Sequence, residues 1–364
     1  MSESFQATNA ASNKRPLEDD TEALSTTQAK KARDDAPELV RDEEFWYEDG
    51  TIILVARNVE FRVYKGVLAD HSSVFADMFS LPQPASTSAR TTPAEIPVVY
   101  LEDSPEDLRH ILRALLPKKS ALVKFVAEDP SFHEISAEAR LGHKYQIDAL
   151  FNRSLSYLKE CFPTDFDARQ KWLKDHNNNQ VPVEWGVHGA MVFAIGVVNI
   201  ARLAQVDTIL PSALAVCCCL DAKQLVKGFE REDGSRERLS EEDLELCITG
   251  MRRLAHEASV AVVTEFARFI LPNGCTGEAD CQNAINQLLS DYGDNSEPYF
   301  PFKNPFRDWD DWITEYWEEE VELEEDAVCE TCSAKVLKGF RVQQRDTWKR
   351  LPDIFDLHVK DWPI

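Results

Sequence analysis

Residues 45–79, FWYEDGTIILVARNVEFRVYKGVLADHSSVFADMF, decide the fold of this chain. The apolar run at 52–55 has the length of a strand, and residues 57 and 58 supply a tight turn. Apolar and polar side chains then alternate over 59–64, the period of a second strand. The stretch therefore predicts two short strands joined by a turn.

A helical pattern follows at Val67 and Leu68. Ser72 is placed to cap a second helix, because a serine side chain can accept a hydrogen bond from a free amide at a helix start. The apolar face of that helix carries Val74, Phe75 and two more large side chains before residue 80. We expect a short helix before Ser72 and a second helix after it.

The same kinds of element continue to about residue 162. Residues 98–100 predict a short strand, and Ser104 with Pro105 predicts the start of a helix that Pro117 ends. Two further helices are expected, one near 135–145 and one over 147–158.

These segments, from about 43 to 162, resemble a BTB/POZ domain in order and type. The chain most resembles the fungal BTB proteins, in which a helical C-terminal region ends in a CxxC pair, here Cys329 and Cys332, and a Trp–Leu–Pro motif, here within 348–352. The resemblance implies an α+β BTB/POZ domain of short strands and helices, followed by a mainly α-helical C-terminal domain.

The resemblance also implies the function. BTB domains are protein–protein interaction modules, so we expect a scaffold that forms a homodimer and recruits other proteins. In the family, self-association uses the first helix and its flanking strand; the matching protein-binding candidates are Val67, Leu68, Val74, Phe75 and Lys65. Alternatively, the apolar residues of this set belong to the core of the domain and do not contact a partner.

Two features, at three positions, depart from better-studied members. Tyr64 stands where many have histidine, and Thr51 with Lys65 stands where transcription-factor members resemble one another in an Asp–Arg pocket. The missing carboxylate argues against a corepressor-binding groove of that kind.

Composition limits the other function classes. The chain has 364 residues, and 40 basic against 64 acidic side chains give a formal net charge of −24. This charge opposes binding to nucleic acid or to an anionic membrane. We therefore expect protein partners, with no direct nucleic-acid contact, no membrane and no small-molecule substrate.

The chain divides into a polar tail at 1–40, predicted to be disordered, the BTB/POZ domain at 43–162 and a mainly helical domain at 165–364. A Pro-, Ser- and Thr-rich stretch at 81–97 is predicted to be a flexible insertion. Helices in the second half are expected at 185–205, 211–226, 240–270, 278–291 and 308–325.

Nine scattered cysteines and the lack of a signal peptide predict reduced thiols in an intracellular protein. Cys329 and Cys332 could hold one edge of a zinc tetrahedron. The missing ligands would be His358, the nearest in sequence, or Cys275 and Cys281, which could approach only through the fold. We assign these residues as thiols without a ligand role, so the sequence predicts no metal and no cofactor.

The three adjacent cysteines at 217–219 point in different directions on a helix, and we interpret them as small buried hydrophobes. No nucleophile–base pair, phosphate loop or dinucleotide motif is found, so no enzyme activity is predicted.

Two alternatives to a general scaffold remain open. The chain could be a substrate adaptor of a cullin-type ubiquitin ligase, a role of many BTB proteins. It could also be a nuclear transcription regulator, because basic clusters within 14–33 resemble a bipartite import signal; the alternative is a polar tail that its lysines solvate. The acidic–aromatic segment 299–326 is interpreted first as an amphipathic helix that packs its aromatic face on the C-terminal domain. The alternative is a segment that binds a basic partner, as some transcriptional activation segments do. The localisation is therefore nuclear or cytoplasmic.

Overall fold

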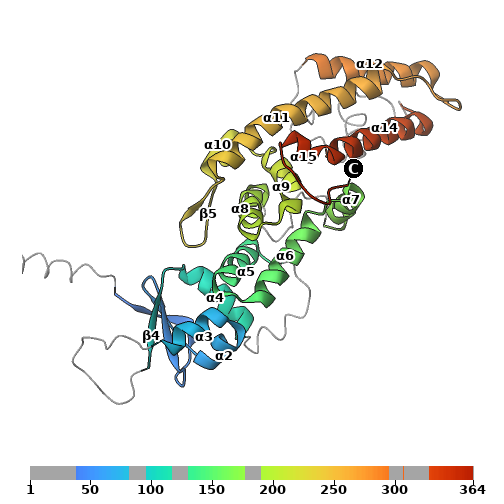
Figure 1. Ribbon diagram of the computed structural model, residues 1–364. Coiled ribbons are helices and arrows are strands. Elements are labelled where there is room, and N and C mark those ends of the chain that lie inside the picture. Colours follow the sequence, from blue (N-terminus) through green and yellow to red (C-terminus); the bar gives the residue numbers. More distant parts are fainter. Residues whose placement is uncertain are drawn as a thin grey trace, which may run out of the picture.

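The computed structural model describes residues 38–81, 96–116, 130–176, 190–294, 306 and 328–363. Several predicted segments lie outside these residues. They are most of the tail with its import signal, the middle of the insertion at 81–97, the helix expected at 308–325 and nearly all of the acidic–aromatic segment at 299–326. Figure 1 shows a small sheet at one end of an elongated molecule, with helices continuing to the other end.

A four-stranded sheet organises the N-terminal part. Its strands are β1 (Val40–Trp46), β2 (Ile52–Ala56), β3 (Val59–Val63) and β4 (Val98–Leu101), in the order β1-β3-β2-β4. β2 and β3 form the predicted antiparallel hairpin, whose turn places Arg57 at φ 54°. β1 pairs with β3, and β4 with β2, in parallel.

The helix after Ser72 begins where the sequence predicted, whereas the first helix begins at Lys65, before the predicted Val67. α2 (Lys65–His71) and α3 (Ser73–Ser80) are separated by Ser72, whose side chain accepts from the Phe75 amide at 3.0 Å. The Ser72 hydroxyl also donates to the carbonyl of Tyr145 at 2.5 Å. One serine thus caps α3 and fastens it to the end of a later helix.

Three longer helices complete this half: α4 (Pro105–Leu115), α5 (Phe132–Tyr145) and α6 (Asp148–Cys161). Ser104 and Ser131 cap α4 and α5 through the amides of Asp107 and Glu134. The inward face of the sheet and the apolar faces of α2 to α5 enclose one core, whose fully buried members include Phe45, Leu54, Phe61, Phe75 and Leu112.

The C-terminal part is helical, as predicted. Its elements are α7 (Phe166–Asp175), η3 (Ala190–Phe193), α8 (Ala194–Ala204), η4 (Asp207–Ile209), α9 (Leu210–Cys217), α10 (Ala222–Lys227), β5 (Phe229–Glu230), β6 (Arg236–Glu237), α11 (Glu241–Val262), the π-helical turn η5 (Val263–Ala267), α12 (Glu278–Asp294), α14 (Glu330–Lys349) and α15 (Leu351–Ile354).

Several boundaries differ from the predictions. The single helix expected at 211–226 is two helices, because Asp221 forms a capping box that begins α10. β1, α7, the β5–β6 hairpin and α14 were not predicted. The helices expected at 240–270 and 278–291 correspond to α11 with η5 and to α12.

A second core crosses the predicted boundary near residue 163. It contains Phe132, Leu158 and Phe162 from α5 and α6 together with side chains of α8, α9, α11, α14 and α15. The Phe132 ring stacks on Phe193 at 4.7 Å. A Cβ at Gly196 would lie 2.3 Å from that ring, so only glycine allows this contact. The backs of α5 and α6 therefore pack on the helical region, and the predicted domain limits stay a prediction.

A buried carboxylate joins the two parts as well. Asp107 on α4 is 7% exposed and accepts from Arg140 on α5 at 3.0 and 3.1 Å. It also accepts from Arg231 of the β5–β6 hairpin at 2.5 Å. One side chain thus holds α4, α5 and the hairpin together.

No helix of the described segments is both long enough and apolar enough to cross a membrane.

We expect Asp107→Asn to lower the free energy of unfolding by about 3 kcal/mol, because two guanidinium groups lose the carboxylate that compensates their burial. Urea unfolding measures this change. The control is Glu44→Gln, which removes an exposed pair with Arg113 and should cost under about 1 kcal/mol. Equal losses in the two variants would contradict the linking role of Asp107.

Candidate protein-interaction surface

The structure separates the predicted protein-binding residues by burial. Leu68 and Phe75 are 1% and 0% exposed and lie in the core beneath α2 and α3. Val67, Val74 and Lys65 are half-buried. Of the five candidates, these three present part of their side chains on the surface of α2 and α3, and the binding role of the set stays a prediction.

Lys65 and Thr51 are neighbours, as their predicted pairing implies. The Thr51 hydroxyl accepts from the Lys65 amide at 2.9 Å, which satisfies a free N–H group at the start of α2. The Lys65 ammonium donates to the Phe79 carbonyl at 3.1 Å, near the end of α3. A cation at a helix C-terminus is favoured by the helix dipole, so Lys65 has a structural partner in place of a carboxylate.

Tyr64, the other departure from the better-studied members, contacts two residues between β1 and β2. Its hydroxyl donates to Asp49 at 2.8 Å, and its ring lies 5.0 Å from that of Tyr47. The hydrogen bond to Asp49 raises the pKa of Tyr64. The side chain of Tyr64 is thus engaged by Asp49 and Tyr47.

The face of the sheet turned away from the core is accessible at its β4 side. Side chains alternate along a strand, so the partners of the buried Val99 and Leu101 point outward: Val98 is 37% and Tyr100 73% exposed. Val98 lies opposite the half-buried Ile53. We name Ile53, Val98 and Tyr100 the outer patch.

The outer patch adjoins a strand edge. In the described part of the chain β4 pairs with β2 alone, so its second edge carries backbone groups that no described strand uses. Such an edge can accept a further strand from another chain, while side chains beside it supply specificity.

The opposite side of this half is covered by the chain itself. The β5–β6 hairpin reaches α4, where Glu232 lies 2.8 Å from His110. Asp233 pairs with Arg57 in the β2–β3 turn at 2.5 Å, in addition to the Arg231–Asp107 pair. Burial disfavours ionisation of Asp233, but hydrogen bonds from Ser235 and Arg57 outweigh it and lower its pKa to about 2.

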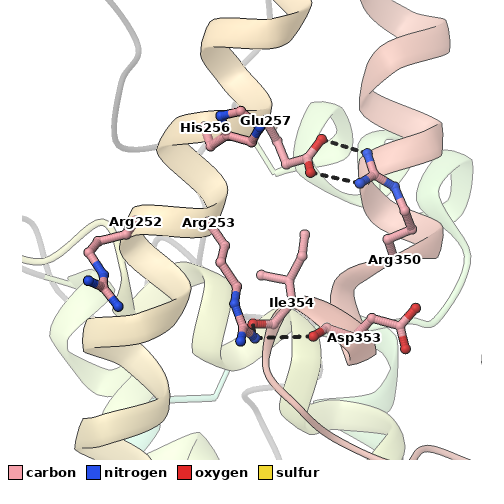
Figure 2. A pocket seen from close by; sticks show the side chains of 7 residues that line it. All are labelled: Arg252, Arg253, His256, Glu257, Arg350, Asp353 and Ile354. Atoms are coloured by element: carbon pink, nitrogen blue, oxygen red, sulfur yellow. Dashed lines mark hydrogen bonds and ion pairs between the residues drawn. The ribbon is translucent and has the colours of Figure 1, made fainter.

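The helical region contains a groove of about 430 Å³. Figure 2 shows the side chains that line it, which are Arg252, Arg253, His256, Glu257, Arg350, Asp353 and Ile354. Arg350 binds Glu257 through two contacts of 2.7 and 2.5 Å. Arg253 donates to the Ile354 carbonyl at 2.7 Å. These contacts fasten α11 to the α14–α15 segment, so the charged groups of Arg253, Glu257 and Arg350 are used in helix packing.

The fold brings four of the nine cysteines together. Cys329 and Cys332, the two candidates from sequence, lie at the start of α14 beside Cys275 and Cys281, and the four sulfur atoms are within 4.8 Å of one another. Backbone amides of Thr276 and Cys332 lower the pKa of the Cys329 thiol to about 5. His358 is exposed and does not belong to this group.

The adjacent cysteines at 217–219 differ from this group. Cys217 and Cys218 are buried in the second core, and Cys219 is half-buried. Burial raises the pKa of the Cys217 thiol, which agrees with the interpretation of small apolar side chains.

Two features were missed from sequence. The pattern VVYL at 98–101 has the alternation that predicts an exposed Tyr100, but only the pairing of β4 shows that it lies at an edge. The hairpin at 229–237 is nearly all polar and had no apolar signal.

Comparison with known proteins identifies one segment of the chain. Residues 47–161 match the family model of the BTB/POZ domain. Neither the curated proteins nor the solved structures contain a match to the chain. The chain thus contains a BTB/POZ domain followed by a helical region, as the sequence predicted.

The Asp233 contacts predict a pH dependence. The folded-state pKa is lowered, so the carboxylate stabilises the protein fully above the unfolded value near 3.8, and this contribution is lost as the pH falls toward about 2. We therefore expect Asp233→Asn to lower the urea midpoint at about pH 5.5 and to matter less at about pH 3.

The matched control is Glu48→Gln, because Glu48 forms an exposed pair with Arg62 at 3.6 Å. This variant should show little effect at either pH. A pH-independent loss in Asp233→Asn would mean that the carboxylate charge is not what fastens the hairpin.

Proposed function

We propose that this chain is a protein–protein interaction scaffold that self-associates and recruits other proteins through its BTB/POZ domain. The observation that carries the proposal is the BTB/POZ match over 47–161, because domains of this family bind proteins and are not a known enzyme family. The acidic net charge of −24 also favours basic or neutral protein surfaces over nucleic acid.

We assign self-association to the exposed side of α2 and α3. The accessible parts of Val67, Val74 and Lys65 lie there, on the first helices after the β2–β3 hairpin. Family members self-associate through the first helix and its flanking strand, which supports this choice. Leu68 and Phe75 would contribute from beneath, by keeping the two helices in position.

We assign recruitment of other proteins to the outer patch and the β4 edge. An exposed tyrosine is a common anchor in interfaces, because its ring buries a large area at a small cost in conformational entropy. The hairpin side is already in contact with the helical region, so it offers less free surface.

Self-association predicts a dimer in light scattering of the purified full chain. The double substitution Val67→Asp and Val74→Asp should raise the dimer dissociation constant at least about 10-fold, since it places charge in an apolar contact. The control is Val226→Asp on α10, a 56% exposed position in the helical region, which should keep the dimer.

A monomeric wild-type chain at high micromolar concentration would remove the self-association proposal. Circular dichroism of each variant separates the loss of the dimer from loss of the fold.

A cullin adaptor is the second candidate, supported by the presence of a large helical region behind the BTB/POZ domain that could hold a substrate. The test is binding of a purified cullin N-terminal region to the wild-type chain and to Tyr100→Arg. Failure of the wild-type chain to bind would remove this candidate.

A nuclear role rests on the basic residues within 14–33. A reporter fused to residues 1–40 that stays cytoplasmic would exclude that signal.

A further inference from the structure

Four cysteines from two distant segments converge at the end of the molecule far from the sheet. Cys275 precedes α12 and Cys281 lies in its first turn. Cys329 is the residue before α14 and Cys332 lies in its first turn. α12 and α14 can be followed at the far end of the helical region in Figure 1.

The spacing of the sulfur atoms is that of metal ligands. All four lie within 4.8 Å of one another, and the sulfurs of Cys275 and Cys329 are 3.8 Å apart. A zinc–sulfur bond of about 2.3 Å gives a tetrahedron whose edges are about 3.8 Å. A disulfide would require about 2.05 Å, and the four cysteines are free thiols.

From this geometry we propose that Cys275, Cys281, Cys329 and Cys332 bind one structural zinc ion that clamps α12 to α14. The ligand pattern is C-x5-C and C-x2-C, with the two pairs supplied by different helix starts.

The surroundings of the sulfurs suit thiolate ligands. The amide of Glu278 donates to the Cys275 sulfur at 3.2 Å, and the amide of Cys329 donates to the Cys281 sulfur at 3.3 Å. Such outer contacts orient ligands and offset the negative charge of four thiolates. Both pairs also lie at helix N-termini, where the helix dipole favours negative charge.

The four sulfur donors determine which metal the site prefers and whether the site is open to solvent. Four thiolates in a tetrahedron suit zinc or iron, and zinc is favoured because divalent zinc binds such ligands more tightly than divalent iron. Four ligands leave no position open for water or substrate. Sulfurs this close surround one ion and leave no room for a polynuclear cluster. Cys281 and Cys332 are fully buried, whereas Cys275 and Cys329 are half-buried. The site is therefore closed and structural.

The bound ion would stabilise the packing of α12 on α14. Among the described residues, the core under α12 and α14 has seven buried members: Ala261, Val262, Phe266, Ile285, Leu288, Val336 and Phe340. Small cores are commonly supplemented by a metal or a disulfide. Gly277 fits the same arrangement, since a Cβ there would lie 2.6 Å from the Cys281 sulfur.

The direct test is metal analysis of the full chain, purified reduced and without chelator. We expect about one zinc per chain. Cobalt added to the metal-free chain should give the visible spectrum of a tetrahedral cobalt–thiolate site, which needs no variant. Zinc should also protect four thiols from a thiol reagent, relative to the chelator-treated chain.

The variants Cys275→Ser and Cys329→Ser should each lower zinc affinity at least about 100-fold, because each removes a ligand. The control is Cys219→Ser, a half-buried cysteine outside the group, which should retain the metal. Hydrogen exchange after chelation should rise in α12 and at the start of α14, with the BTB/POZ sheet unchanged.

The proposal is overturned if the reduced wild-type chain takes up neither zinc nor cobalt, or if Cys275→Ser and Cys329→Ser bind zinc as tightly as wild type. Formation of Cys275–Cys329 and Cys281–Cys332 disulfides in the chain as isolated from reducing medium would also overturn it.

Discussion

The carboxylate of Asp107 is the contact on which the arrangement of this protein depends. It lies on α4, and it accepts hydrogen bonds from Arg140 on α5 and from Arg231 on the β5–β6 hairpin. Removing this carboxylate would take the close charge partner from two partly buried guanidinium groups, leaving Arg140 with the Ser136 hydroxyl and Arg231 with Glu237 at 3.9 Å. The aromatic contact of Phe132 with Phe193 acts at the same junction, and the second core continues from there into α8 and α9. The helical region is thus packed on the BTB/POZ domain rather than joined to it by a linker alone.

This junction determines which surfaces a partner could reach. The hairpin occupies the side of α4 and the β2–β3 turn through the pairs of Glu232 with His110 and of Asp233 with Arg57. The exposed sides of α2 and α3 and the outer patch with Tyr100 lie elsewhere on the domain. A scaffold of this form can self-associate and bind a second protein at once, because the two proposed surfaces use different elements.

Local sequence signals predicted the elements whose stability is decided locally. β2, β3, α3 and α4 carry a clear apolar period, a turn or a serine cap, and each was placed within a few residues. β1 was missed because its sequence, VRDEEFW, has almost no apolar period. Its two buried side chains are Phe45, which lies in the core, and Asp42, which accepts from Arg109 on α4 at 2.6 Å. The cysteine group could not be assigned either, since 48 residues separate Cys281 from Cys329 and only the packing of α12 near α14 unites them.

The claim that the BTB/POZ domain and the helical region share one core is tested most directly by calorimetry of the full chain, compared with a fragment of residues 38–163. The shared residues Phe132, Leu158 and Phe162 would be uncovered in the fragment. The account predicts that the N-terminal part unfolds together with α8 and α9 in one cooperative transition and that the fragment melts at a clearly lower temperature. A fragment that melts at the temperature of a separate transition in the full chain would contradict it.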